Sequence, residues 1–166
     1  MKKILLAIML MAPMSMMAQK FAHYDLNQIL PNMKEYTTAQ SELENMQKQY
    51  EADLKLMQDE LQKKSEELQK EGPKLVENIR ARREQELNDL YQRYQQSYQD
   101  SQQALQKASL EKYGAINEKV LAAVKKLGEA GGYVYVVDTS TGSIPFVNTT
   151  LSTDITAQIK KEVGVQ

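Results

Sequence analysis

The chain has 166 residues, of which 26% are charged, with a formal net charge of −1, no cysteine and one histidine. This length suits a single domain. The balanced charge lacks the basic excess that nucleic-acid binding requires. Without cysteine there are no disulfides or thiolate metal ligands, and one histidine cannot form a histidine-cluster metal site. We expect no metal, no cofactor and no nucleic-acid partner.

The first eighteen residues have the form of a bacterial signal peptide. Met1 to Lys3 is basic, Ile4 to Met11 is apolar, and Ala18 precedes the expected mature start at Gln19. The alternative is a membrane anchor, but the apolar run falls short of the roughly 20 residues that span a bilayer. The sequence therefore predicts a periplasmic protein and leaves its association with the outer membrane open. Cleavage after Ala18 would remove Lys2 and Lys3 and give the mature chain a net charge of −3.

Two long helices are predicted after a short opening segment. Residues 20–24 read as a strand, and Asp25 to Gln28 has capping-box spacing for a short helix that Pro31 ends. A second capping box, Asn32 to Glu35, should open a helix that continues to Glu71. After the break at Gly72-Pro73, another helix should run from Lys74 to about Leu127, before Gly128 and Gly131-Gly132. Residues 32–128 are thus predicted to form an antiparallel hairpin arm with its tip near 71–74.

The apolar stripe on these helices repeats every eleven residues, as at Ala39, Tyr50 and Leu61. This period is close to that of a straight helix, so the arms should be nearly straight, about 55 and 80 Å long. Polar residues such as Ser65 and Ser101 stand in the stripe. The seam between the helices is therefore predicted to be weak and flexible.

Opposite net charges favour pairing of the two long helices. Residues 36–72 carry nine acids and five bases, whereas residues 73–128 carry seven acids and ten bases. Bases also gather around the break, at Lys63, Lys64, Lys70, Lys74, Arg80, Arg82 and Arg83. This basic tip is either solvated surface or a contact for anionic lipid or lipopolysaccharide.

The C-terminal segment is β-rich. Residues 132–138 are predicted to be a strand, and residues 143–147 a second strand that pairs with it, with Pro145 limiting it to an edge. Thr153 or Asp154 should cap a final helix that ends near Val163, with Ile155, Ile159 and Val163 on one face. Residues 19–31 and 129–166 together form a small β/α body that buries too little surface to be stable alone. We therefore expect oligomerisation through the body, and a mainly α fold with a small β part (α+β).

Few residues point to chemistry. His23 is expected to be a packed or surface residue, and Asp138 a carboxylate that starts a turn. Asn148 begins a glycosylation-type triplet of the kind that occurs often by chance. Tyr91, Tyr94 and Tyr98 share helical spacing, and they form either part of the hairpin seam or an aromatic surface for extended chains. Without a nucleophile–base pair or a phosphate loop, the sequence gives no support for an enzyme.

Three local strings carry a family resemblance. They are KFAHYD at residues 20–25, GYVYVVD at 132–138 and DIT at 154–156. Placed around a long hairpin behind a signal peptide, they make the mature chain resemble the Skp/OmpH family of periplasmic chaperones. Familiar members are strongly basic, whereas this chain is slightly acidic.

The resemblance implies a jellyfish-like homotrimer, in which a β-body carries three hairpin arms around a cavity. The cavity holds unfolded outer-membrane β-barrel precursors without ATP. Residues expected in diffuse client binding are Tyr50, Met57, Leu61, Tyr91, Tyr94 and Tyr98, and those expected in the trimer body are Phe21, Val134, Val136, Phe146 and Ile155. The alternative is a structural or adaptor coiled coil of the envelope without holdase activity.

Overall fold

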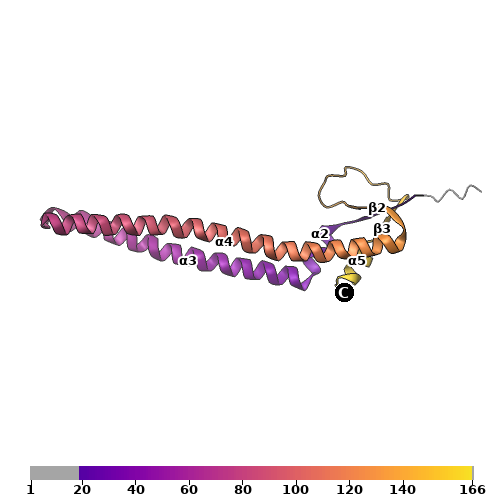
Figure 1. Cartoon of the computed structure of the whole chain (residues 1–166), viewed down its shortest axis with the longest axis horizontal. Coiled ribbons are helices and arrows are strands. Elements are labelled where there is room, and N and C mark those ends of the chain that lie inside the picture. Colours follow the sequence, from indigo (N-terminus) through magenta and orange to yellow (C-terminus); the bar gives the residue numbers. More distant parts are fainter. Residues whose placement is uncertain (1–18, 166) are drawn as a thin grey trace, which may run out of the picture.

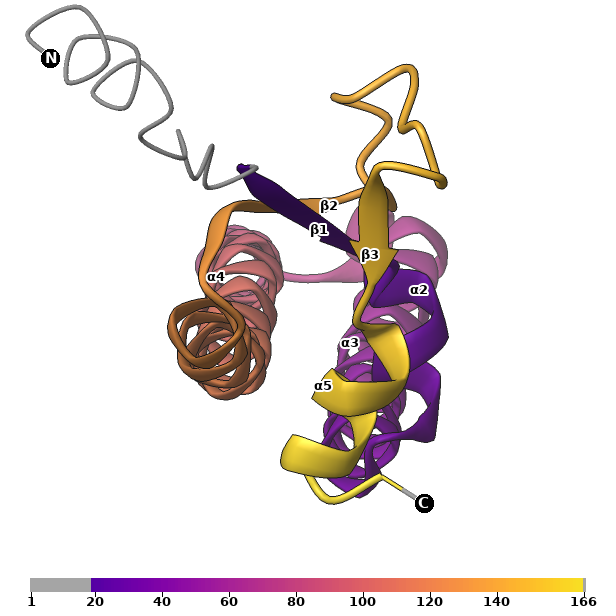
Figure 2. The ribbon, with the colours of Figure 1, turned by 90° about the vertical axis from the view of Figure 1, so that its right-hand side faces the viewer.

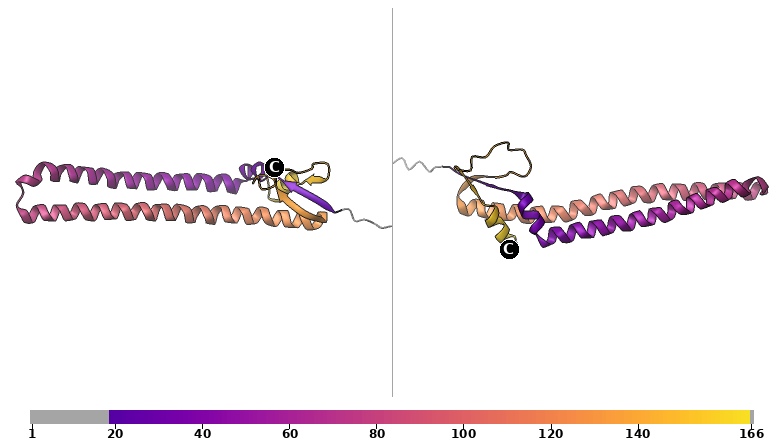
Figure 3. Two further views of the ribbon diagram at one scale, coloured as in Figure 1. Left: turned by 90° about the horizontal axis from the view of Figure 1, so that it is seen from above. Right: turned by 180° about the vertical axis from the view of Figure 1, so that it is seen from behind.

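A long helical hairpin dominates the computed structural model, which describes residues 19–165 (Figure 1). Helix α3 spans Lys34–Glu71 and helix α4 spans Glu77–Gly131. At 1.5 Å per residue their lengths are about 57 and 82 Å. They lie side by side for the whole length of α3 (Figure 3). The predicted hairpin is confirmed, while the predicted signal peptide at 1–18 lies outside the described residues.

The helix ends differ from prediction in three places. The Gly72–Lys74 turn (η2) keeps Lys74 out of α4, which begins three residues later because Leu75 and Val76 are extended. At the other end α4 continues through Gly128, and stops where Gly132 adopts a left-handed φ of 64° that favours glycine. The capping box at Asn32 is wrong, since its side chain donates to the Gln28 carbonyl instead.

A three-stranded parallel sheet lies at the base of the hairpin. Its central strand is β1 (Lys20–Tyr24), flanked by β2 (Tyr133–Asp138) and β3 (Ser152–Asp154). The predicted C-terminal β-hairpin is wrong, because residues 143–147 lie in an irregular loop and β3 forms instead. Pro145 has no N–H for a ladder, and parallel strands need the long connection that residues 139–151 supply.

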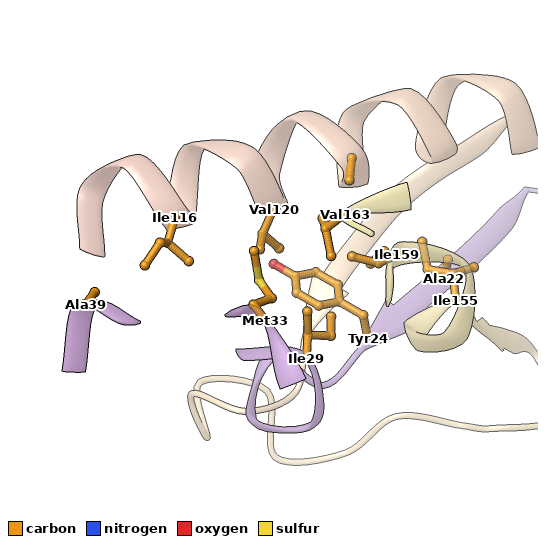
Figure 4. Packing of buried hydrophobic residues seen from close by; sticks show 11 residues of the cluster. Ala22, Tyr24, Ile29, Met33, Ala39, Ile116, Val120, Ile155, Ile159 and Val163 are labelled. Carbon is orange, nitrogen blue, oxygen red and sulfur yellow. The ribbon is translucent and has the colours of Figure 1, made fainter. Parts of the chain in front are cut away.

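One hydrophobic core joins the sheet to the base of the hairpin (Figure 4). Helix α2 (Leu26–Ile29), the η1 turn (Leu30–Asn32) and helix α5 (Thr156–Glu162) surround it. Figure 2 looks along the hairpin from the end that carries the sheet and α5. Helix α5 ends near the predicted residue and buries the predicted face. The predicted cap is wrong, because Thr153 and Asp154 lie in β3 and Ile155 is the N-cap. The core residues are Ala22, Tyr24, Ile29, Met33, Ala39, Ile116, Val120, Ala123, Ile155, Ile159 and Val163. The core therefore includes the base of the arm as well as the predicted body.

Candidate functional site

The seam of the arm is thin beyond its base. Among the described residues of α3 only Ala39 is buried, and in the outer part of α4 only Leu90 and Ser101 are. The apolar stripe is not covered near the tip, where Val76 and Ile79 are 72% and 41% exposed. Most apolar side chains of the arm therefore contact both the opposite helix and solvent.

The six predicted client-binding residues fall into separate hollows. A groove of about 650 Å³, here the Tyr91 groove, is lined by Gln58, Leu61, Gln62, Ser65, Glu84, Leu87, Asn88, Tyr91 and Tyr94. A second groove of about 520 Å³, here the Tyr50 groove, is lined by Tyr50, Asp53, Leu54, Leu56, Met57, Ser97, Asp100, Ser101 and Ala104. Their α3 residues are centred roughly 100° apart around the helix, so the grooves flank opposite sides of the seam. Tyr98 lines a smaller hollow with Tyr94, Gln95 and Gln99.

Ion pairs between the two helices of the arm have the predicted polarity, with acids on α3 and bases on α4. Within the part of the chain that the structure describes, Lys112 pairs with Glu42, Lys119 pairs with Glu35, and Arg83 lies 2.9 Å from Glu71. Each joins a base of α4 to an acid of α3. The hydrogen bond from Lys119 is the main cause of the lowered pKa of Glu35. The sequence did not predict these partners, because they depend on the register between the helices.

A wide hollow of about 1010 Å³ lies at the base of the arm. Its apolar lining includes Ala39, Ile116 and Val163, and the Lys112–Glu42 and Lys119–Glu35 pairs rim it. Two of its three lysines are paired within the chain, whereas Lys34 has no salt bridge to another residue of 19–165.

Internal ion pairs reduce the free charge of the basic tip. Four of its seven bases contact carboxylates: Lys70 with Glu66, Arg80 with Glu77 and Glu84, Arg82 with Glu86, and Arg83 with Glu71. Lys63, Lys64 and Lys74 have no salt bridge to another described residue. The positive charge available to an anionic surface is therefore smaller than the sequence suggested.

An aromatic patch covers the outer face of the sheet. Phe21 and Tyr135 stack with ring centroids 6.3 Å apart and an interplanar angle of 8°. Phe146 and Leu151, from the 139–151 loop, are 77% and 73% exposed beside them and line the same hollow of about 320 Å³. Tyr135 and Leu151 were missed, although alternation along the strand separates Tyr135 from its valine neighbours.

The five predicted trimer-body residues do not share one face. Phe21 and Phe146 belong to the aromatic patch, and Val134 is 48% exposed. Val136 packs against the core, and Ile155 is 2% exposed within it. Ile155 therefore packs inside the body of the single chain.

The polar residues of the body support the backbone. Asp138 accepts hydrogen bonds from the Leu26 and Ser140 N–H groups, at 3.4 and 2.9 Å, as a turn-starting carboxylate does. The His23 ring bonds the Ser152 hydroxyl at 2.9 Å. Burial chiefly raises the pKa of Tyr24, and the Asp138 charge adds to this.

Asp154 ties β3 to the last helix. Burial raises its pKa, but hydrogen bonds from the Thr156 side chain and N–H, with the nearby charges of His23 and Lys160, lower it overall. The Thr156 N–H lies 2.8 Å from its carboxylate, and the Thr156 hydroxyl accepts from the Asp25 N–H at 3.1 Å. This chain of bonds links both ends of the body.

Residues 19–165 contain no cluster of His, Asp and Glu placed to hold a metal ion. No helix among those residues has the length and apolar character needed to cross a bilayer. The candidate sites are therefore the Tyr91 groove, the Tyr50 groove and the aromatic patch.

A family model, the OmpH-like outer membrane protein family, matches residues 20–163. The chain belongs to the OmpH-like family. Among solved structures it is similar to an OmpH-like protein of Caulobacter crescentus, a candidate outer membrane chaperone, with 11% identity and a TM-score of 0.72. The alignment covers 87% of this chain and 83% of that one, and at this identity it shows the fold alone. A search of curated proteins finds no match.

Proposed function

We propose that this OmpH-like protein is an ATP-independent holdase of the periplasm, which binds unfolded outer-membrane proteins between the arms of a homotrimer. Membership of the OmpH-like family supports a chaperone role in general. The signal-peptide pattern at residues 1–18 supports export.

The observation that carries this proposal is the projecting arm with open grooves on both sides of its seam. Tyrosine, leucine and methionine side chains line these grooves without being buried in a core. Many small apolar contacts along a flexible arm suit a client without fixed shape, because no single pocket must be matched. Tyrosine adds broad contact area at a low cost in side-chain entropy.

The aromatic patch supports assembly. Phe21, Tyr135, Phe146 and Leu151 are between 36% and 77% exposed in the single chain. A cluster of this kind is typical of a protein–protein interface. Three copies that meet through these patches would bury them, and each arm would project from the shared body.

The direct test is aggregation of a urea-denatured outer-membrane β-barrel protein after dilution, with and without the mature chain and without ATP. We expect suppression at a stoichiometry of about one client per trimer, and sedimentation at three times the mature mass. No suppression at molar excess would reject holdase activity. Binding of one folded partner at fixed stoichiometry, with no affinity for unfolded chains, would favour the structural or adaptor role.

A further inference from the structure

We propose that the Tyr50 groove selects client segments in which basic side chains flank apolar ones, and that it disfavours acidic segments. This inference rests on the proposed holdase function and specifies the chemistry of the client. A chaperone with a basic surface would instead favour acidic segments.

The floor of the groove is apolar and shallow. Leu54 and Met57 of α3 face a row of small residues on α4, which are Ser97, Ser101 and Ala104. The Ser101 hydroxyl donates to the Ser97 carbonyl at 2.6 Å, so it makes no demand on a ligand. A hollow of about 520 Å³ is within the usual size of a ligand pocket and accommodates the side chains of a short extended segment.

The charged residues of the groove are all acidic. Asp53 from α3 and Asp100 from α4 line it, and no lysine or arginine is among its lining residues. Neither carboxylate has a salt bridge to another residue within 19–165. The basic residues nearest in sequence on α3, Lys48 and Lys55, pair with acids of their own helix.

Both carboxylates are available to a ligand. Gln96 donates to one oxygen of Asp100 at 2.8 Å, which orients the group while leaving its charge unneutralised. A cationic side chain of a bound segment would meet a carboxylate on each helix, and the Tyr50 ring offers a further electrostatic attraction for a cation. An acidic segment would meet like charge at the same positions.

The Tyr91 groove lacks this character. Its one carboxylate, Glu84, lies 3.7 Å from the Arg80 guanidinium of the same helix. The other polar residues that line it are amides and hydroxyls. Charge selection therefore belongs to the Tyr50 groove, and the Tyr91 groove should bind apolar segments regardless of their charge.

The test uses three short fluorescent peptides, with alternating leucine and lysine, leucine and serine, or leucine and glutamate. Binding to the full mature protein is measured by anisotropy at low and high salt. We expect affinity to fall in the order lysine, serine, glutamate, and high salt to narrow the differences. The double variant D53N/D100N should bind the lysine peptide about tenfold more weakly and the serine peptide unchanged, since two exposed ion pairs are lost.

The matched control is E60Q/D89N. It removes one carboxylate from each helix at exposed positions that line neither groove. It should change the affinity for the lysine peptide by less than about twofold. An equal loss in both double variants, or equal affinity for the lysine and glutamate peptides, would overturn the inference.

Failure of the underlying function has a different signature. If no peptide binds and the denatured β-barrel protein aggregates freely, both proposals fall. If the β-barrel protein is held while peptide charge makes no difference, the holdase function stands and only the selectivity is wrong.

Discussion

Val120 joins the arm to the body, and shortening it should weaken this joint. Its side chain is 2% exposed and faces Met33 and Val163 in the core (Figure 4). Changing Val120→Ala removes about two methyl groups, worth ~1.6 kcal/mol in transfer, and the residual cavity raises the loss to about 2–2.5 kcal/mol. Alanine favours the helix by ~0.5 kcal/mol, which leaves a net loss of about 1.5–2 kcal/mol in the free energy of unfolding.

Urea unfolding followed by circular dichroism measures this loss. The protein concentration must be fixed, because the proposed assembly would couple stability to concentration. Leu121→Ala is the control, since the adjacent side chain is 58% exposed and its loss should shift stability by no more than about 0.5 kcal/mol. Exposed substitutions usually change the free energy of unfolding by no more than about 0.5 kcal/mol. A Val120→Ala loss within that range, or an equal loss in the Leu121→Ala control, would refute the assignment of Val120 to the joint.

Four further outcomes are expected. Val136→Asp should dissociate the proposed trimer in sedimentation, because it places an unpaired charge against the core of the body; a species of unchanged mass would contradict this. Tyr94→Ala should leave the proposed trimer intact and weaken the proposed binding of a denatured β-barrel protein about twofold, measured by titration. Glu35→Lys and Lys119→Glu should each lower stability by about 0.3–0.5 kcal/mol and largely cancel when combined, as a double-mutant cycle would show. Because the pKa of Asp154 is lowered in the folded state, its ionised carboxylate stabilises the fold at neutral pH, and this stabilisation is lost on acidification. Asp154→Asn should therefore lower the free energy of unfolding by about 0.5 kcal/mol at pH 7, and by less below about pH 4, as measured in urea titrations.

Local sequence signals were sufficient for the hairpin. Glycine and proline are absent between Lys34 and Glu71, and the Gly72-Pro73 break has no equivalent within either helix. These are properties of neighbouring residues, so they need no knowledge of the rest of the fold. The boundary errors at Lys74 and Gly128 arose because a glycine or proline marks a possible end and does not fix the residue where the turn forms.

The sheet depended on distant pairing and was predicted less well. Residues 143–147 have the composition of a strand and were predicted to pair with residues 132–138, yet both β2 and β3 pair with β1. The Ile155 N–H also bonds the His23 carbonyl at 2.9 Å, which continues that pairing into α5. Composition indicates which segments favour an extended backbone. It does not indicate which segment the fold brings beside β1.

The arm surface was only partly predictable for a similar reason. Apolar periodicity correctly gives the side of each helix that faces its partner. It does not give the register, which decides that small residues such as Ser101 lie opposite Tyr50 and Met57. The Tyr50 groove therefore could not be read from either helix by itself.

The central position of β1 has a consequence for the order of folding. Residues 20–24 find their partners only at 133–138 and 152–154, after the whole hairpin has been made. The helices can form from local contacts, but the sheet must wait for nearly the full chain to emerge, and such non-local pairing is slow. A truncated chain that lacks residues 152–154 would therefore carry a complete arm on an incomplete sheet.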